Sequence, residues 1–216
     1  MWRTFHKNDF DSTDKSVYCS LVKTAELSSQ SPRERVLKTA SELFYAQGIR
    51  AVGVDAIIAR AGVAKASFYK HFPSKDDLIV SFLKRRDALL REWVAQTVER
   101  LSPQPAGRPL AVFDALAQRF ASKEFRGCAF LNAIVEIADR NHAAHAVAVE
   151  HKRAFTSYLS GLLEAAGVSM PEELAREFMI LVDGAIVTAL REGSPRAAQS
   201  AKHIAATLLR QAGIAA

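Results

Sequence analysis

Hydrogen-bond donors are concentrated in one short stretch of the chain, ARAGVAKASFYKHFPSK, residues 59–75. Phe68 and Phe72 are four residues apart there, so both rings would lie on one face of a helix and pack inward. The remaining positions carry ammonium, hydroxyl and imidazole groups, at Lys65, Ser67, Tyr69, Lys70 and His71. Such groups can donate to phosphate oxygens and to base edges, so the stretch could bind a nucleic acid. The alternative is an ordinary core helix with a solvated face.

A helix, a glycine turn and a second helix are predicted around these donors. Apolar side chains share one face of a first helix at about 54–60, namely Val54, Ile57, Ile58 and Ala61. Gly62 ends that helix, and a segment at about 65–71 follows. This is the order of a helix-turn-helix unit, whose second helix enters the major groove of DNA. Ser74 and Lys75 then begin another helix, where a hydroxyl, backbone amides and a cation could hold a phosphate.

Helical periodicity continues along the chain, and no stretch shows the sustained period-two alternation of a strand. The predicted helices span about 32–47, 54–60, 65–71, 75–101, 109–121, 127–138, 142–166, 171–191 and 195–212. The predicted fold class is therefore all-α. Residues 1–30 are polar and lack clear periodicity, so we expect a mobile N-terminal extension there, with a short helix near 17–27.

The predicted helices divide into two domains. We expect a three-helix DNA-binding domain of the helix-turn-helix type at 31–78 and a second helical domain at 79–216. The long helix at 75–101 joins the two domains. It ends at SPQPAGRP, residues 102–109, because three prolines within that stretch cannot continue a helix.

Positive charge belongs to the first half of the chain. The formal net charge is +6; residues 31–100 carry 13 Lys and Arg against 8 Asp and Glu, whereas residues 101–216 carry 12 against 11. This excess favours a polyanionic partner, with a merely solvated basic face as the alternative.

No apolar run reaches about 18 residues and the start lacks a secretory signal, so we expect a cytoplasmic protein without membrane contact. Cys19 and Cys128 indicate no disulfide framework.

The segment VDAIIARAGVAKASFYKHFPSKDDLI, residues 54–79, resembles the DNA-binding signature of the TetR family of transcriptional regulators. That signature runs as a Val-x-x-Ile helix, an Ala-Gly-Val turn, Leu-Tyr-x-His-Phe and a Ser-Lys pair, and the resemblance covers about residues 33–83. It implies that Lys65, Ser67 and Lys70 lie on the recognition segment. It also implies that Tyr69 and His71 contact the DNA backbone and that Lys75 holds a phosphate.

Two positions depart from the family pattern. Gly53 and Ala64 stand where a hydroxyl residue usually caps the two helices of the helix-turn-helix unit. A side chain that could both cap the helix and meet a phosphate is absent at each position. How the recognition helix is held at its start is therefore a question for the structure.

The segment FMILVDGAIVTAL, residues 178–190, is apolar almost all round, so most of its circumference must be covered. The residues themselves leave a deep core and a subunit interface as alternatives. The resemblance implies a homodimer formed through the last two long helices, and thus a palindromic operator. The expected interface residues are Phe178, Val182, Ala185, Ile186, Ala189, Ala201, Ile204, Ala205 and Leu208.

A small-molecule pocket is expected in the second domain. The segment FRGCAFLNAIVEIADRNHAAH combines apolar surface with a few polar anchors, as ligand sites do, although most of these residues could equally be core. The resemblance implies that this domain, 79–216, binds an unidentified effector as well as forming the dimer. The candidate lining residues are Phe113, Leu116, Phe120, Cys128, Phe130, Leu131, Asn132, Val135, Glu136, Phe155 and Tyr158.

A metal site or a redox site is not favoured by the pattern. His142, His145, Glu150 and His151 lack a cysteine or carboxylate cluster beside them, and Cys128 lacks a resolving cysteine. We therefore expect no metal and no cofactor.

The leading hypothesis is a homodimeric regulator, a repressor bound to double-stranded DNA and released by a small molecule. The alternatives are a DNA-binding architectural protein without an effector and a helical enzyme that uses Cys128 with a histidine.

Overall fold

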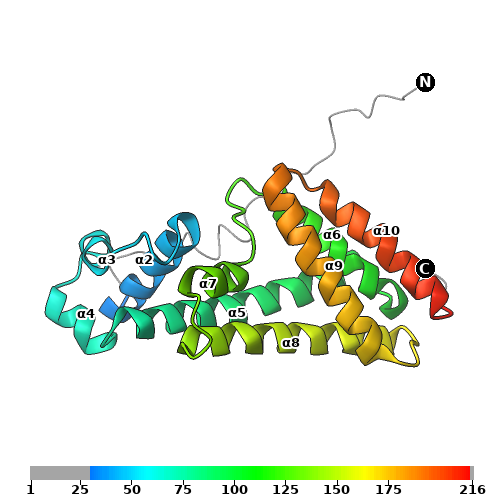
Figure 1. The fold of residues 1–216 in the computed structure, drawn as a ribbon, viewed down its shortest axis with the longest axis horizontal. Coiled ribbons are helices and arrows are strands. Elements are labelled where there is room, and N and C mark those ends of the chain that lie inside the picture. Colours follow the sequence, from blue (N-terminus) through cyan, green and yellow to red (C-terminus); the bar gives the residue numbers. More distant parts are fainter. Residues whose placement is uncertain (1–29, 215–216) are drawn as a thin grey trace, which may run out of the picture. The chain divides into compact units, whose positions relative to one another are not determined.

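The computed structural model describes residues 30–214, and within that range the regular structure is entirely helical (Figure 1). The elements are α2 (Pro32–Gln47), α3 (Val54–Ala61), α4 (Lys65–His71), α5 (Lys75–Leu101), the 3-10 turn η1 (Pro105–Gly107), α6 (Arg108–Phe120), α7 (Ala129–Ile137), α8 (Ala143–Ala165), α9 (Pro171–Glu192) and α10 (Arg196–Gln211). The all-α fold is thus confirmed, and every helix predicted beyond residue 30 has bounds within two residues of an observed one. The turn η1 was not predicted, and the N-terminal extension at 1–30 with its helix near 17–27 falls almost wholly outside the described residues.

Local capping explains why two of the helices begin where they do. Ser31 precedes α2 and its hydroxyl accepts the amide of Glu34 at 3.3 Å. Ser74 plays the same part for α5, accepting the amide of Asp77 at 3.1 Å. Each hydroxyl satisfies an amide that has no partner within its own helix, so these starts are specified by a few neighbouring residues.

Two hydrophobic cores lie along α5, which has 27 residues. The first core joins α2, α3, α4 and the first half of α5 to α7 and the beginning of α8. The second joins the end of α5 to α6, the rest of α8, α9 and α10. Helices α5 and α8 pack against each other, and both contribute to both cores. They therefore connect the two parts of the protein mechanically.

Helix α7 follows α6 in the chain but belongs to the first core. Its residues Ala129, Phe130 and Ala133 are buried together with the helix-turn-helix residues, and in Figure 1 α7 is drawn between α2 and α9. The division of the chain into domains at 31–78 and 79–216 stays a prediction. In the structure, α7 completes the core that surrounds α2, α3 and α4, although it lies much later in the chain.

Among residues 30–214, none of the helices has the length and apolar content that crossing a bilayer would require.

Candidate nucleic-acid interface

Helix α4 separates its residues into a buried and an exposed set. Phe68 is fully buried, and its ring centroid lies 6.0 Å from that of Phe72, which is also buried. Tyr69 packs edge-on against Phe68 at 5.2 Å but remains 45% exposed. Lys65 and Lys70 are exposed, and Ser67 and His71 are partly exposed. The structure thus presents the expected donors on the surface of one short helix that two phenylalanines anchor, while their contact with DNA stays a prediction.

The turn before α4 is held by backbone geometry and by α2. Gly62 adopts the left-handed conformation with φ 63°, which suits glycine, and its amide donates to the carbonyl of Ala59 at 3.3 Å. The Nη2 of Arg35 donates to the Gly62 carbonyl at 3.3 Å, which ties the turn to α2. Arg35 was missed in the sequence, because a contact across 27 residues leaves no local pattern.

Neither helix of the unit has a side-chain cap, as the departures at Gly53 and Ala64 suggested. The Ala64 carbonyl accepts the amide of Phe68 at 3.1 Å, so α4 is closed by its backbone and by its buried rings. Lys65, the first residue of α4, also pairs with Asp55 of α3 at 3.4 Å. Both partners are well exposed, so the pair contributes at most about 1 kcal/mol and can open when a phosphate approaches.

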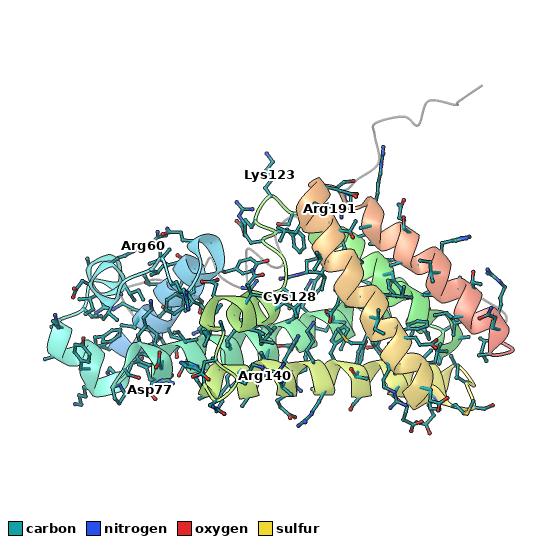
Figure 2. The ribbon with its side chains drawn as sticks, in the orientation of Figure 1. Arg60, Asp77, Lys123, Cys128, Arg140 and Arg191 are labelled. Carbon is teal, nitrogen blue, oxygen red and sulfur yellow. The ribbon has the colours of Figure 1, made fainter. Side chains whose placement is uncertain are left out.

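The predicted phosphate clamp at the start of α5 is arranged differently from the expectation. The Ser74 hydroxyl donates to the carboxylate of Asp77 at 2.6 Å while it accepts the amide of Asp77, so it is fully occupied in capping. Figure 2 labels Asp77 at this end of α5. The ammonium of Lys75 lies 5.9 Å from the ring centroid of Phe44 and is only partly exposed. The Ser74 hydroxyl is therefore occupied within the helix start, and a phosphate contact by Lys75 stays a prediction.

The residues expected to line a ligand pocket are divided between the two cores. Phe113, Leu116, Phe120 and Phe155 are buried in the second core, with Tyr158 packed against it. Cys128, Phe130 and Leu131 belong to the first core. Figure 2 labels Cys128, the residue that directly precedes α7. The structure therefore does not bring the whole candidate set to one place.

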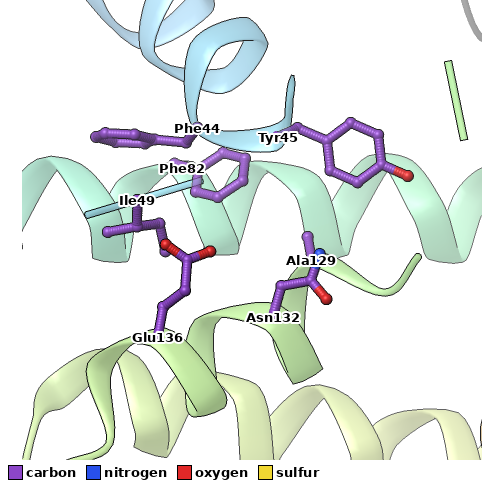
Figure 3. Close-up of a pocket in the computed structure, with 7 residues that line it drawn as sticks. All are labelled: Phe44, Tyr45, Ile49, Phe82, Ala129, Asn132 and Glu136. Atoms are coloured by element: carbon purple, nitrogen blue, oxygen red, sulfur yellow. The ribbon is translucent and has the colours of Figure 1, made fainter. Parts of the chain in front are cut away.

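Three further candidates lie on other surfaces of α7. Val135 is 77% exposed, so it lines no enclosed pocket in this structure. Asn132 and Glu136 face α2 instead and border a small, shallow hollow (Figure 3). The other residues around this hollow are Phe44, Tyr45, Ile49, Phe82 and Ala129. Polar groups on an apolar helix suggested ligand anchors, but Glu136 accepts the backbone amide of Arg50 in the turn after α2, and Asn132 donates to the carbonyl of Arg126 in the loop before α7.

Most of the expected dimer residues are buried inside the protomer. Phe178, Val182, Ala185 and Ala189 of α9 and Ala201 and Ala205 of α10 are buried in the second core and present little surface to a partner, so their place in a dimer interface stays a prediction. Ile186 and Leu208 are partly buried against the same core, and Ile204 is 48% exposed. The free apolar surface of α9 instead consists of Ile180, Val187 and Leu190. Both sides of α9 are apolar, so periodicity could not tell which side faces inward.

Two of the histidines, His142 and His151, serve the fold. The Nδ1 of His142 accepts the amide of Ala144 at 3.1 Å and so caps α8. His151 is 4% exposed, its ring stacks on Phe130 at 3.6 Å, and its Nδ1 lies 2.7 Å from the carboxylate of Asp87. Because a carboxylate only accepts, Nδ1 donates to it. In residues 30–214, no group of three or more potential ligands is placed to hold a metal ion.

Acid should weaken the fold through His151. Burial lowers the pKa of its imidazole below the usual 6.5, with smaller contributions from nearby Lys152 and Arg91, and the hydrogen bond and charge of Asp87 oppose this only in part. The unfolded chain therefore binds the proton more tightly, and this contribution to stability is present above about pH 6.5 and lost below it, by at most about 1.4 kcal/mol per pH unit.

Urea unfolding of the protein and of His151→Gln between pH 8 and 5 will measure this loss. Glutamine can still donate to Asp87 but does not titrate in this range. We expect the protein to lose more stability on acidification than the variant does. A constant difference between the two across the pH range would contradict the assignment.

Comparisons with known proteins agree with the geometry of this surface. The family model described as bacterial regulatory proteins, tetR family, matches residues 36–82, from α2 into α5. The structure of SCO4454, a TetR-family transcriptional regulator from Streptomyces coelicolor, is 35% identical, with a TM-score of 0.76, over 84% of this chain and 95% of that one.

Two relatives from Escherichia coli K12 are also similar. The HTH-type transcriptional regulator YjdC is 23% identical over 178 residues, which are 82% of this chain and 93% of YjdC. The HTH-type transcriptional repressor NemR is 25% identical over 133 residues, which are 61% of this chain and 67% of NemR. The similarity to SCO4454 and YjdC extends through the helices that follow the DNA-binding segment.

Proposed function

The chain belongs to the TetR family of helix-turn-helix transcriptional regulators, and from that premise we propose that it acts as a cytoplasmic, homodimeric repressor that binds a palindromic operator and is released by a small molecule. It is a regulator and not an enzyme, and its helix-turn-helix unit binds DNA. The observation that carries the proposal is α4 itself. Phe68 in α4 and Phe72 directly after it are buried, while Lys65, Tyr69 and Lys70 of α4 are exposed.

Support for a homodimer comes from the apolar surface that α9 and α10 leave uncovered. Ile180 is 72% exposed, Val187 55% and Ile204 48%, which is unusual for side chains of this size in neighbouring helices. Gly184 lies between the two α9 residues, and a Cβ placed on it would meet no atom within 4 Å, so another backbone could approach there. A second copy of this chain is the partner we propose, because a two-fold symmetric protein matches a palindromic operator.

Support for an effector comes from the second core, which contains aromatic residues of α6, α8 and α9. Phe113 contacts Phe178, and Phe155 contacts Tyr158, whose hydroxyl could orient a ligand. We propose an apolar ligand with at least one polar group. Its binding would favour a separation of the two α4 helices that no longer fits successive major grooves. Since α5 contributes to both cores, it is the element that would transmit the change.

Repression is proposed over activation because NemR, one of the similar proteins, is named a repressor. The alternative of an architectural DNA-binding protein without an effector predicts weak sequence preference and no stabilisation by any ligand. A footprint on the DNA that flanks the protein's own gene, repeated with candidate ligands, separates these two functions. A palindromic protected site that a ligand abolishes supports the proposal, whereas diffuse protection that no ligand changes favours the architectural role.

The exposed donors of α4 make a specific prediction about salt. Lys70→Ala should weaken operator binding by roughly 1–3 kcal/mol and lower the slope of log K against log salt by about 1 for each phosphate that the protein no longer neutralises. Tyr69→Ala should weaken binding with a smaller change in slope, because a hydroxyl releases no counterion. Both variants should remain folded and dimeric, since the side chains are exposed.

Fluorescence anisotropy titrations at several salt concentrations will measure both effects. Lys123→Ala is the matched control, because Figure 2 shows this exposed lysine projecting from the loop before α7. Its removal should leave both the affinity and the slope unchanged. If Lys70→Ala and Lys123→Ala have the same affinity and the same salt slope, α4 is not part of the DNA interface.

A further inference from the structure

The end of α2 is tied to the loop before α7 by the hydroxyl of Tyr45. This hydroxyl donates to the carbonyl of Gly127 at 3.0 Å and accepts the amide of Arg126 at 3.0 Å. The guanidinium of Arg86 lies 3.5 Å from the centroid of the same ring, on its α5 side. One side chain of α2 therefore satisfies two backbone groups that are more than 80 residues away in the chain.

The turn after α2 is tied to the other end of α7 by Glu136. Its carboxylate accepts the backbone amide of Arg50 at 2.9 Å. Gly48 adopts φ 94°, and a Cβ placed on it would lie 3.0 Å from the same carboxylate. Glycine therefore provides both the backbone conformation and the space that bring Glu136 to this turn. Figure 3 shows Tyr45 and Glu136 around the hollow between α2 and α7.

The two contacts are spaced along α7, one just before its first turn and one in its last turn. The nine residues of Ala129–Ile137 make a helix about 13 Å long. A single contact would leave α2 free to pivot on α7, whereas two contacts at this separation oppose rotation as well as translation. Between the two contacts, Ala129 and Ala133 are buried in the first core. The apolar packing therefore holds α7 in this core, and the two polar contacts set the angle between α2 and α7.

We propose that Tyr45 and Glu136 are positioning residues for DNA recognition. They hold the helix-turn-helix unit on α7 at a set orientation, and so they determine the separation at which the two α4 helices of a dimer meet successive major grooves. This inference rests on the proposed dimer and its palindromic operator. It concerns residues outside α4 that need not touch DNA.

The expected effect is a change in the preferred spacing of the operator half-sites. Tyr45→Phe keeps the ring over which Arg86 stacks and removes only the hydroxyl, and Glu136→Ala removes the acceptor for Arg50. Glu136→Gln keeps an acceptor oxygen and should behave like the unchanged protein. Val135→Ala, at an exposed position on the same helix, is the control for altering α7 without altering a contact.

The test uses duplexes that carry the footprinted palindrome, together with versions that have one base pair added or removed at its centre. The unchanged protein should prefer the natural spacing, whereas Tyr45→Phe and Glu136→Ala should lose roughly tenfold affinity there and less on an altered spacing, with dimerisation intact. Glu136→Gln should restore the preference.

Four outcomes overturn the inference. Unchanged affinities, or an equal loss on all spacings, would leave Tyr45 and Glu136 without a positioning role while the proposed function stands. Failure of Glu136→Gln to restore the preference would show that the acceptor at Arg50 is not what matters. If the unchanged protein itself prefers no spacing, the palindromic dimer fails, and the inference fails with it.

Discussion

Val187→Glu will convert the protein to a monomer and lower its affinity for the operator by about 100-fold or more, since linked binding of two half-sites is lost. Val187 is 55% exposed on α9, between Ile180 and Leu190 on the uncovered apolar surface. In an isolated protomer a glutamate there would be solvated and compatible with a helix. In a dimer its charge would be buried without a partner, which costs several kcal/mol.

Analytical ultracentrifugation and operator titrations on the same preparation will test this expectation. Val135→Glu is the matched control, because it places the same charge at another exposed valine, on α7. It should remain dimeric and bind with full affinity. A dimeric Val187→Glu with unchanged affinity would exclude the α9 surface as the interface, and monomers in the unchanged protein would exclude the homodimer altogether.

Phe68→Ala will lower the free energy of unfolding by about 3–5 kcal/mol. The helix-turn-helix unit will unfold as a result, and operator binding will be lost. Phe68 is fully buried between Phe72 and the rest of the first core, and neither helix of the unit has a side-chain cap to compensate. The second core shares no buried residue with the first, so the dimer should survive.

Two spectroscopic probes distinguish local from global unfolding. Trp93 packs against the second core, so its fluorescence in a Trp2→Phe background reports on that core, while circular dichroism reports on all helices. We expect the circular dichroism transition of Phe68→Ala to move to lower urea and the Trp93 transition to move less. Lys70→Ala, at an exposed position of the same helix, should move neither. Coincident shifts of both probes would mean that the two cores unfold as one.

Helix boundaries and the faces of α4 could be predicted because they depend on short-range chemistry. Ser31 and Ser74 each accept the amide of the residue three positions ahead, and Gly62 ends α3 within its own turn. The i, i+4 spacing of Phe68 and Phe72 likewise separates the inner face of α4 from Lys65, Tyr69 and Lys70. The sequence also showed that Gly53 and Ala64 cannot provide side-chain caps. It did not show which contacts hold these helix starts in place of caps.

The roles of α7 and α9 could not be predicted, because they depend on which distant segment covers each face. Asn132 and Glu136 were interpreted as ligand anchors, yet they face α2, where Glu136 accepts an amide 86 residues away. On α9 the inner row contains Phe178 and Val182 and the outer row Ile180 and Val187, and both rows are apolar. Periodicity detects an apolar face but carries no information about its partner.

By itself, the sequence determined the all-α class, the order of the helices and the separation of buried rings from exposed donors around α4, since these follow from periodicity, caps and turns within a few residues. Only the tertiary structure decided that α7 completes the core around α2, α3 and α4, and which side of α9 remains exposed. It also showed that Arg35 ties the turn at Gly62 to α2 and that Tyr45 ties α2 to the loop before α7. The physical reason is that packing is a choice among several apolar faces of similar hydrophobicity. That choice is made by shape and by the pairing of buried polar groups far apart in the chain.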